Sequence, residues 1–203
     1  MSELPGRTEV LVVGAGPVGL AVAASLAGHG HGVTVVDRQA TGANTSRAAV
    51  VHARTLEMLE QIGVSKRLAG LGIQAPQFSI RDGDRELVPV RFDRLPTEYP
   101  YTLMVPQNIT EQVLLDRLEE LGGRVHRPYV ANGVSQTADG AEVTLESGDM
   151  IKAQYVVAAD GMNSTIRDLA GQGQSPHRVR LLFSCASQAP SRRRASDAGR
   201  GGR

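Results

Sequence analysis

Glu9-Val10-Leu11-Val12-Val13-Gly14-Ala15-Gly16-Pro17-Val18-Gly19 is the stretch of sequence that decides the fold of this chain. It opens with a short apolar, β-branched run that stops at glycine, which predicts a buried strand. Residues 18–30 are rich in Ala and Leu and end in Gly28-His29-Gly30, which predicts a helix with a glycine stop. Residues 33–37, Val-Thr-Val-Val-Asp, predict a second buried strand. Together they form a β-α-β unit with a right-handed crossover.

Three glycines in this unit have separate physical tasks. Gly14 permits a tight turn, Gly16 lets a pyrophosphate approach the backbone, and Gly19 lets helix and strand pack closely. N–H groups at the helix start attract phosphate charge, and Pro17 suits the first turn because it lacks an N–H. The alternative is a glycine-rich turn without a ligand. The strand–loop–helix context favours a dinucleotide site, formed by Gly14, Ala15, Gly16, Pro17 and Gly19.

The second strand ends in Asp37, which is followed by Arg38. A carboxylate at this place accepts hydrogen bonds from ribose hydroxyls and disfavours a 2′-phosphate, so NADP is not expected in this site. We include Asp37 and Arg38 among the expected cofactor-binding residues. The β-α-β unit alone leaves both FAD and NAD open.

Further helices and strands follow the β-α-β unit. Residues 54–71 have helical spacing, and residues 78–90 predict a hairpin around Asp82-Gly83-Asp84. Asn108-Ile109-Thr110-Glu111 has capping-box spacing and predicts the start of a helix that runs to about Leu121. Three further predictions complete the pattern: two or three antiparallel strands in 124–151, a buried strand at 155–159, and a short helix at 164–169.

Composition narrows the functional classes. The 203 residues are 41% hydrophobic and include no Trp, so aliphatic side chains must fill the core. No apolar run is long enough to span a membrane, and the N-terminus lacks signal-peptide features. The single cysteine, Cys185, excludes an internal disulfide. The histidines show no metal-ligand spacing. We therefore expect a cytoplasmic protein without a metal site or membrane contact.

Four motifs stand in order along the chain: Gly14-Ala15-Gly16-Pro17-Val18-Gly19-Leu20, Ser46-Arg47-Ala48, His52-Ala53-Arg54-Thr55-Leu56-Glu57 and Ala159-Asp160-Gly161-Met162-Asn163-Ser164. Their order and spacing resemble the para-hydroxybenzoate hydroxylase family of FAD-dependent aromatic monooxygenases, from about Glu9 to Gly171. The resemblance implies an α/β fold: an incomplete, glutathione-reductase-like FAD-binding Rossmann domain with part of an antiparallel β substrate domain. The FAD-binding domain would comprise residues 1–75 and 105–171, and residues 76–104 would belong to the substrate-domain sheet.

The resemblance also implies roles for single residues. Arg47 would lie near the flavin pyrophosphate, and Gln107 would hydrogen-bond the flavin. Asp160 and Gly161 would form a second fingerprint that contacts FAD and assists NAD(P)H, with Arg167 supporting that turn. The alternatives stay open: a solvated surface arginine, an ordinary loop glutamine, and a helix N-cap at Asp160.

The activity implied by the resemblance is NAD(P)H- and O₂-dependent hydroxylation of an aromatic or polyketide substrate, with FAD as the cofactor. No catalytic residue can be named. The family's later Gly-Asp motif has no counterpart after Asp160, since the Gly-Asp pairs are Gly83-Asp84 and Gly148-Asp149. We therefore expect a truncated chain, and whether it is active stays open. Two alternatives remain: a vestigial, non-catalytic flavin-binding fragment and an NAD-dependent reductase.

Residues 172–203 differ in composition from the rest of the chain. They are rich in Arg, Ser, Gly and Ala, include Arg192-Arg193-Arg194, and lack hydrophobic periodicity over most of their length. We expect an Arg-rich tail that is foreign to the family and disordered, because it buries too little apolar surface. A change of reading frame near Gln172 to Ser175 would explain this composition. The rival reading, a nucleic-acid-binding tail, is disfavoured because no aromatic residues are interleaved for stacking.

Overall fold

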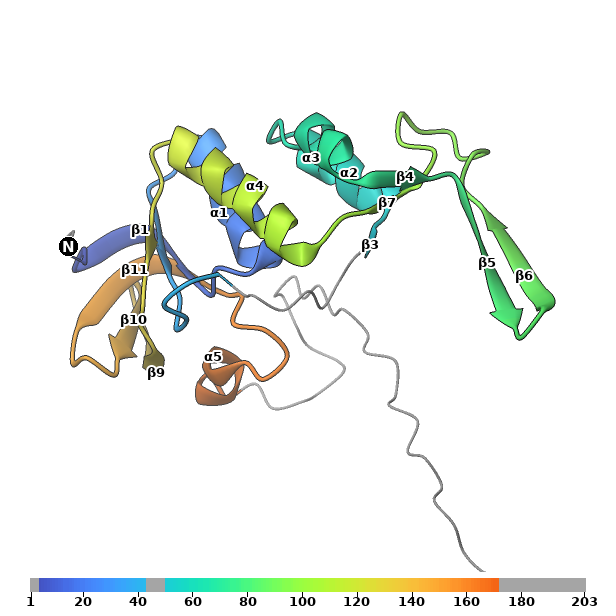
Figure 1. Cartoon of the computed structure of the whole chain (residues 1–203). Helices are drawn as coiled ribbons and strands as arrows, with labels where there is room; N and C mark the ends of the chain where they lie inside the picture. Colours follow the sequence, from blue (N-terminus) through green and yellow to red (C-terminus); the bar gives the residue numbers. More distant parts are fainter. Residues whose placement is uncertain (1–3, 43–49, 172–203) are drawn as a thin grey trace, which may run out of the picture.

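A computed structural model of the chain describes residues 4–42 and 50–171 (Figure 1). Its largest element is a six-stranded sheet in the order β8-β2-β1-β11-β10-β9. β1 pairs in parallel with β2 and β11, and β2 pairs in parallel with β8. β10 and β9 extend the sheet in antiparallel fashion. The bounds are β8 Val125–His126, β2 Val33–Val36, β1 Arg7–Val13, β11 Met150–Ala158, β10 Gly140–Leu145 and β9 Ala131–Thr137.

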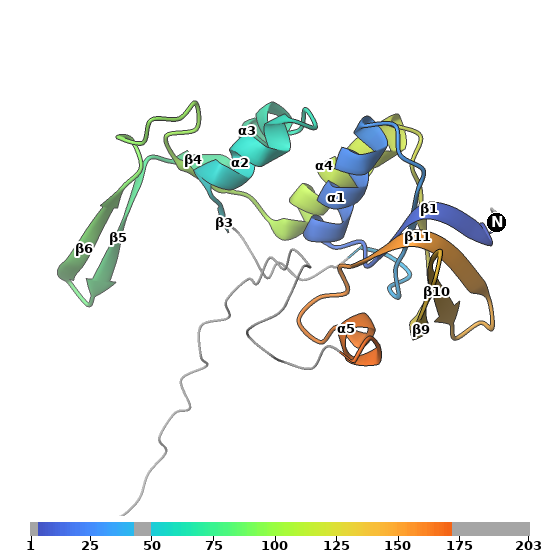
Figure 2. The same ribbon diagram turned by 180° about the vertical axis from the view of Figure 1, so that it is seen from behind.

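Helices cover both faces of this sheet. Helix α1, Pro17–Gly28, and helix α4, Gln107–Glu120, lie side by side on one face, and helix α5, Thr165–Leu169, lies on the other (Figures 1 and 2). Along β1, Val10 and Val12 belong to the core under α1 and α4, whereas Leu11 and Val13 belong to the core that includes Ile166 of α5. Burial on both faces explains why β1 is a continuous apolar run rather than an alternating one.

Two helices occupy the segment for which the sequence predicts a single helix at 54–71. Helix α2 spans Ala53–Glu60 and helix α3 spans Ser65–Leu71. The chain turns between them at Gly63, whose φ of 77° lies in the left-handed region. The prediction of one continuous helix is therefore wrong. The apolar residues whose spacing suggested the helix are nevertheless all buried: Leu56, Leu59, Ile62 and Leu68.

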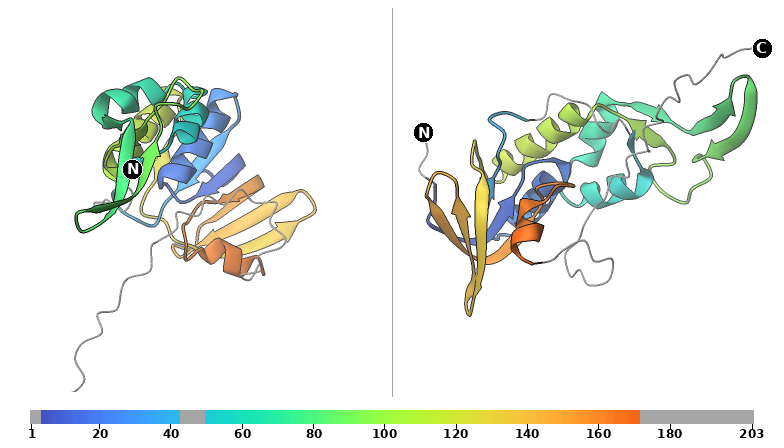
Figure 3. Two further views of the ribbon diagram at one scale, coloured as in Figure 1. Left: turned by 90° about the vertical axis from the view of Figure 1, so that its right-hand side faces the viewer. Right: turned by 90° about the horizontal axis from the view of Figure 1, so that it is seen from below.

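Two small sheets lie beyond these helices. Strands β3 Val50–Val51, β7 Thr102–Met104 and β4 Ile73–Ala75 form one of them, with β7 in the middle. Strands β5 Gln77–Asp82 and β6 Arg85–Arg91 form the predicted hairpin, which extends away from the six-stranded sheet (Figure 3). In the β3-β7-β4 sheet, β3 and β4 come from the segment expected in the FAD-binding domain, and β7 comes from the segment expected in the substrate domain. The division into two domains stays a prediction.

Three further expectations need correction. Two of the antiparallel strands expected in 124–151 are present as β9 and β10, but Val125–His126 is a further strand that pairs in parallel with β2. Residues 150–158 form one strand, although we expected an antiparallel strand ending near 151 and a separate strand at 155–159. Residues 150–153 of this strand pair with β10, and residues 152–158 pair with β1. Helix α4 begins at Gln107 with Pro106 as its N-cap and no side-chain cap bond, so the predicted capping box is wrong. In the described part of the chain, no helix has the length and apolarity needed to cross a membrane.

Candidate functional site

The loop between β1 and α1 is held by the two strands beside β1. The N–H of Gly14 donates to the carbonyl of Val36 at 2.8 Å, and the N–H of Ala159 donates to the carbonyl of Val13 at 2.8 Å. Gly14 has φ +105°, and a Cβ built there would lie 2.3 Å from the carbonyl oxygen of Ala159. Only glycine therefore fits the turn that the sequence assigned to it.

Gly16 and Gly19 differ in what surrounds them. A Cβ at Gly16 would meet no atom within 4 Å, so the backbone there is open to a ligand. A Cβ at Gly19 would lie 1.9 Å from the carbonyl oxygen of Gly14 and 3.2 Å from Cβ of Ala159. Gly16 is the N-cap of α1 without a side-chain cap bond, and helix geometry leaves the N–H groups of Val18 and Gly19 without intrahelical acceptors. The loop thus presents an open, electropositive helix end.

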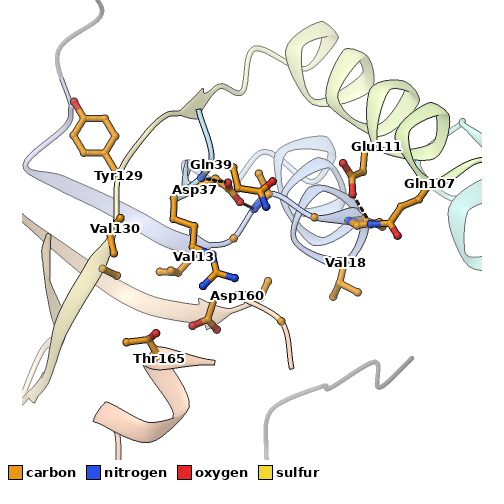
Figure 4. A pocket seen from close by; sticks show the side chains of 18 residues that line it. Val13, Val18, Asp37, Gln39, Gln107, Glu111, Tyr129, Val130, Asp160 and Thr165 are labelled. Atoms are coloured by element: carbon orange, nitrogen blue, oxygen red, sulfur yellow. Dashed lines mark hydrogen bonds between the residues drawn. The ribbon is translucent and has the colours of Figure 1, made fainter. Parts of the chain in front are cut away.

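A cavity of about 320 Å³ lies over this loop (Figure 4). It is situated at the carboxyl ends of β1, β2 and β11, which is where open α/β sheets bind ligands. Most residues expected to bind the cofactor line this cavity: Gly14, Ala15, Gly16, Pro17, Asp37, Arg38, Gln107, Asp160 and Gly161. Sequence reasoning missed other lining residues, namely Gln39, Glu111, Tyr129, Val130 and Thr165.

Two expected site residues are not part of the described lining. Gly19 lies behind the loop, where its lack of a side chain allows α1 to pack on Gly14 and Ala159. Arg47 lies outside the described residues, so its expected place near a pyrophosphate stays a prediction. Within residues 4–42 and 50–171, no group of three His, Cys, Asp or Glu side chains is arranged to hold a metal ion.

Asp37 fastens the end of β2 to the glycine loop. Its Oδ2 accepts a hydrogen bond from the N–H of Ala15 at 2.6 Å, and its Oδ1 accepts one from the N–H of Gln39 at 2.8 Å. The Nε of Arg127 lies 4.0 Å from Oδ1, and this guanidinium also donates from Nη2 to the carbonyl of Ala15 at 3.5 Å. Each carboxylate oxygen keeps further lone-pair capacity. Asp37 therefore orders the loop and can still accept from ribose hydroxyls.

Asp160 lines the cavity and also braces the start of α5. Its Oδ1 accepts from the hydroxyl of Ser164 at 2.5 Å, and its Oδ2 accepts from the N–H of Ile166 at 3.1 Å. Ser164 is the N-cap, since its Oγ accepts from the N–H of Arg167 at 3.1 Å. Nη2 of Arg167 donates to the carbonyl of Met162 at 3.1 Å, so Arg167 supports this turn as expected. Asp160 is therefore not the N-cap of α5, although its carboxylate accepts from an N–H in the first turn of that helix.

Gln107 and Glu111 line the cavity from the first turns of α4. Nε2 of Gln107 donates to Oε1 of Glu111 at 2.7 Å, one helical turn later. Glu111 is only 6% exposed. In the sequence, Glu111 is notable for its capping-box spacing from Asn108. Its spacing of four residues from Gln107 is equally typical of a solvated helix face.

Comparison with known proteins agrees with this geometry. A 12-dehydrotetracycline 5-monooxygenase/anhydrotetracycline 6-monooxygenase of Streptomyces rimosus is 37% identical over 184 residues, covering 87% of this chain and 36% of that protein. A rifampicin monooxygenase of Streptomyces venezuelae is 36% identical over 177 residues, covering 86% of this chain and 37% of that protein. A solved structure of the anhydrotetracycline hydroxylase of S. rimosus superposes with a TM-score of 0.74 at 34% identity, covering 81% of this chain and 34% of the other.

The chain thus spans little more than a third of each of these proteins. The family model described as an FAD binding domain matches residues 7–194, which continues past Gly171, where the resemblance was expected to end. The α/β fold, the parallel strands around the glycine loop and these matches agree with one another. The chain belongs to the FAD-binding domain family that it shares with flavin-dependent aromatic and polyketide monooxygenases.

Proposed function

We propose that this chain binds FAD in the cavity over the glycine loop and serves NAD(P)H- and O₂-dependent hydroxylation of an aromatic or polyketide substrate. The observation that carries the proposal is the open backbone at Gly16 beside the uncapped N-terminus of α1. A side chain there would project into the space that a pyrophosphate must occupy, and the helix end attracts its charge.

The residues around the cavity fit the parts of FAD in order. Asp37 at the end of β2 would accept from the adenosine ribose, and the N–H groups of Val18 and Gly19 would face the pyrophosphate. Gln107, across α1 from Asp37, would contact the flavin end (Figure 4). Gly161 offers a second open backbone segment, because a Cβ there would meet no atom within 4 Å. When bound, FAD supplies the redox chemistry, while these residues bind and orient it.

The substrate class is proposed from the relatives. One of them is named for tetracycline intermediates and another for rifampicin, both large polycyclic or polyketide molecules with aromatic rings. Anhydrotetracycline and rifampicin are therefore the first substrates to offer this chain. The proposal concerns the class of molecule, because we assign the described cavity to the cofactor and not to the substrate.

A second candidate is flavin binding without turnover. It is supported by the lining of the described cavity, to which only cofactor-binding roles are assigned. An NAD-dependent reductase is the third reading, since a β-α-β unit with a terminal acid is compatible with NAD.

The test starts with the purified 203-residue chain, which is mixed with FAD, desalted and scanned in the visible range. The proposal predicts a retained flavin band with about one FAD per chain, as one dinucleotide site requires. Consumption of NAD(P)H that rises with anhydrotetracycline or rifampicin, with a hydroxylated product by mass spectrometry, would support hydroxylation. Retained FAD without such consumption would favour the second candidate. Absent FAD with stoichiometric NAD binding would refute both.

A further inference from the structure

The amide of Gln107 is held by a buried carboxylate at the edge of the cavity. Gln107 is the first residue of α4, and Glu111 follows one turn later on the same side of the helix. Their side chains meet at the edge of the cavity beside the start of α1, near Val18 (Figure 4). Nε2 of Gln107 donates to Oε1 of Glu111 over 2.7 Å, a short hydrogen bond between an amide and a carboxyl oxygen.

This contact decides which way the amide points. Oε1 of Glu111 accepts from Nε2, so the NH₂ group of Gln107, and not its carbonyl oxygen, faces Glu111. The carbonyl Oε1 and the second N–H of Nε2 are then available for a ligand. Because Glu111 is 6% exposed and sits within the turns of α4, the position of its carboxylate is itself restrained.

We infer that Glu111 is a positioning residue, which holds the side-chain amide of Gln107 in one orientation for bound FAD. The inference rests on the proposed function, because it needs FAD in this cavity. A free glutamine side chain loses rotamer freedom when it contacts a ligand, and an amide ordered beforehand avoids that loss. Glu111 therefore acts through Gln107 and does not itself need to contact the cofactor.

The expected loss of FAD affinity is set by the rotamer freedom of one side chain, that of Gln107. Ordering such a side chain on binding weakens affinity by roughly 2- to 10-fold. Glu111→Leu keeps a helix-forming, apolar side chain of similar bulk but removes the acceptor. Glu111→Gln keeps an oxygen that can accept from Nε2 of Gln107 and should retain most of the affinity. Glu119→Ala, on an exposed position of the same helix, is the matched control.

A double-mutant cycle on the full chain separates positioning from a general structural effect. The FAD dissociation constant is measured by quenching of flavin fluorescence for the unaltered chain, E111L, Q107A and the double variant. We expect E111L to weaken FAD binding roughly 2- to 10-fold in the unaltered background and to have no further effect beside Q107A. Equal weakening in both backgrounds, or unchanged affinity in E111L, would overturn the inference.

A variant in which the two residues are exchanged shows whether a loss of FAD affinity comes from a failure to fold. The double variant Gln107→Glu with Glu111→Gln retains one amide-to-carboxylate bond on the helix but presents a carboxylate in place of the amide. We expect its unfolding midpoint to stay near that of the unaltered chain while its FAD affinity falls at least as far as in Q107A. Full affinity in this variant would overturn the inference. Failure of the unaltered chain to retain FAD would instead refute the proposed function, and the inference with it.

Discussion

Alanine at Gly19 is expected to act mainly on the stability of the fold, and alanine at Gly16 mainly on FAD binding. The two glycines belong to the same loop and the same helix end, three residues apart, so each variant is the control for the other. Gly19→Ala should destabilise the fold. Gly16→Ala should leave the fold nearly unchanged and weaken FAD binding.

The geometry sets the magnitude for Gly19→Ala. The new Cβ would lie 1.9 Å from the carbonyl oxygen of Gly14, and a backbone atom cannot turn away as a side chain can. Overpacking of this kind reduces the free energy of unfolding by about 3 kcal/mol. Alanine gains about 1 kcal/mol in helix propensity over glycine, which offsets part of the loss. The net change of about 2 kcal/mol corresponds to a fall of about 4–8 °C in Tm for a domain of this size.

Gly16→Ala has no such clash. Gly16 has φ −74° and ψ −179°, values that alanine adopts without strain, and no atom lies within 4 Å of the new Cβ. Replacing glycine at an N-cap by alanine costs about 1 kcal/mol or less. The methyl group would project into the space of the pyrophosphate, where overpacking by about 1–3 kcal/mol would weaken FAD binding roughly 5- to 150-fold.

Two measurements are needed. Urea unfolding of the FAD-free chain is monitored by far-ultraviolet circular dichroism, and FAD affinity is measured by titration with fluorescence quenching. Surface substitutions usually change the free energy of unfolding by no more than about 0.5 kcal/mol. A change as small as that in Gly19→Ala would refute the packing argument. Unchanged FAD affinity in Gly16→Ala would refute the assignment of the pyrophosphate to this loop.

Further variants test other parts of the site. Asp37→Ala removes the acceptor for the N–H groups of Ala15 and Gln39, and we expect a loss of about 1–3 kcal/mol in urea unfolding together with loss of retained FAD. Ser164→Ala removes the N-cap of α5 and should lower the free energy of unfolding by about 1–2 kcal/mol, measured in the same way. Burial, with a smaller contribution from a nearby arginine, lowers the pKa of His126 in the folded chain from its usual 6.5. The unfolded state then binds this proton more tightly, so stability should fall as pH drops below about 6.5, and His126→Gln should flatten that part of the Tm-against-pH curve.

Local patterns predicted much of the site, and the reason is the short range of the contacts involved. Residues 9–37 form strand, loop, helix and strand in sequence order, so periodicity and glycine spacing are enough to place the loop and Asp37. The hairpin at 77–91 likewise depends on a turn at Gly83, whose φ is 57°. Two local predictions failed because competing local features were stronger: Gly63 breaks the helix predicted at 54–71, and Pro106 takes the N-cap position ahead of Asn108.

The sequence by itself determined the β-α-β unit, the place of the glycine loop and the family resemblance, because each depends on residues close together in the chain or on the order of motifs. Only the tertiary structure showed that β8 joins β2 in parallel, that β11 is one long strand beside β1, and that Glu111 holds Gln107 at the cavity. Strand partners and the burial of a helical carboxylate depend on which distant segments pack together. A local pattern carries no information about those partners, since the same spacing suits both an exposed and a buried face.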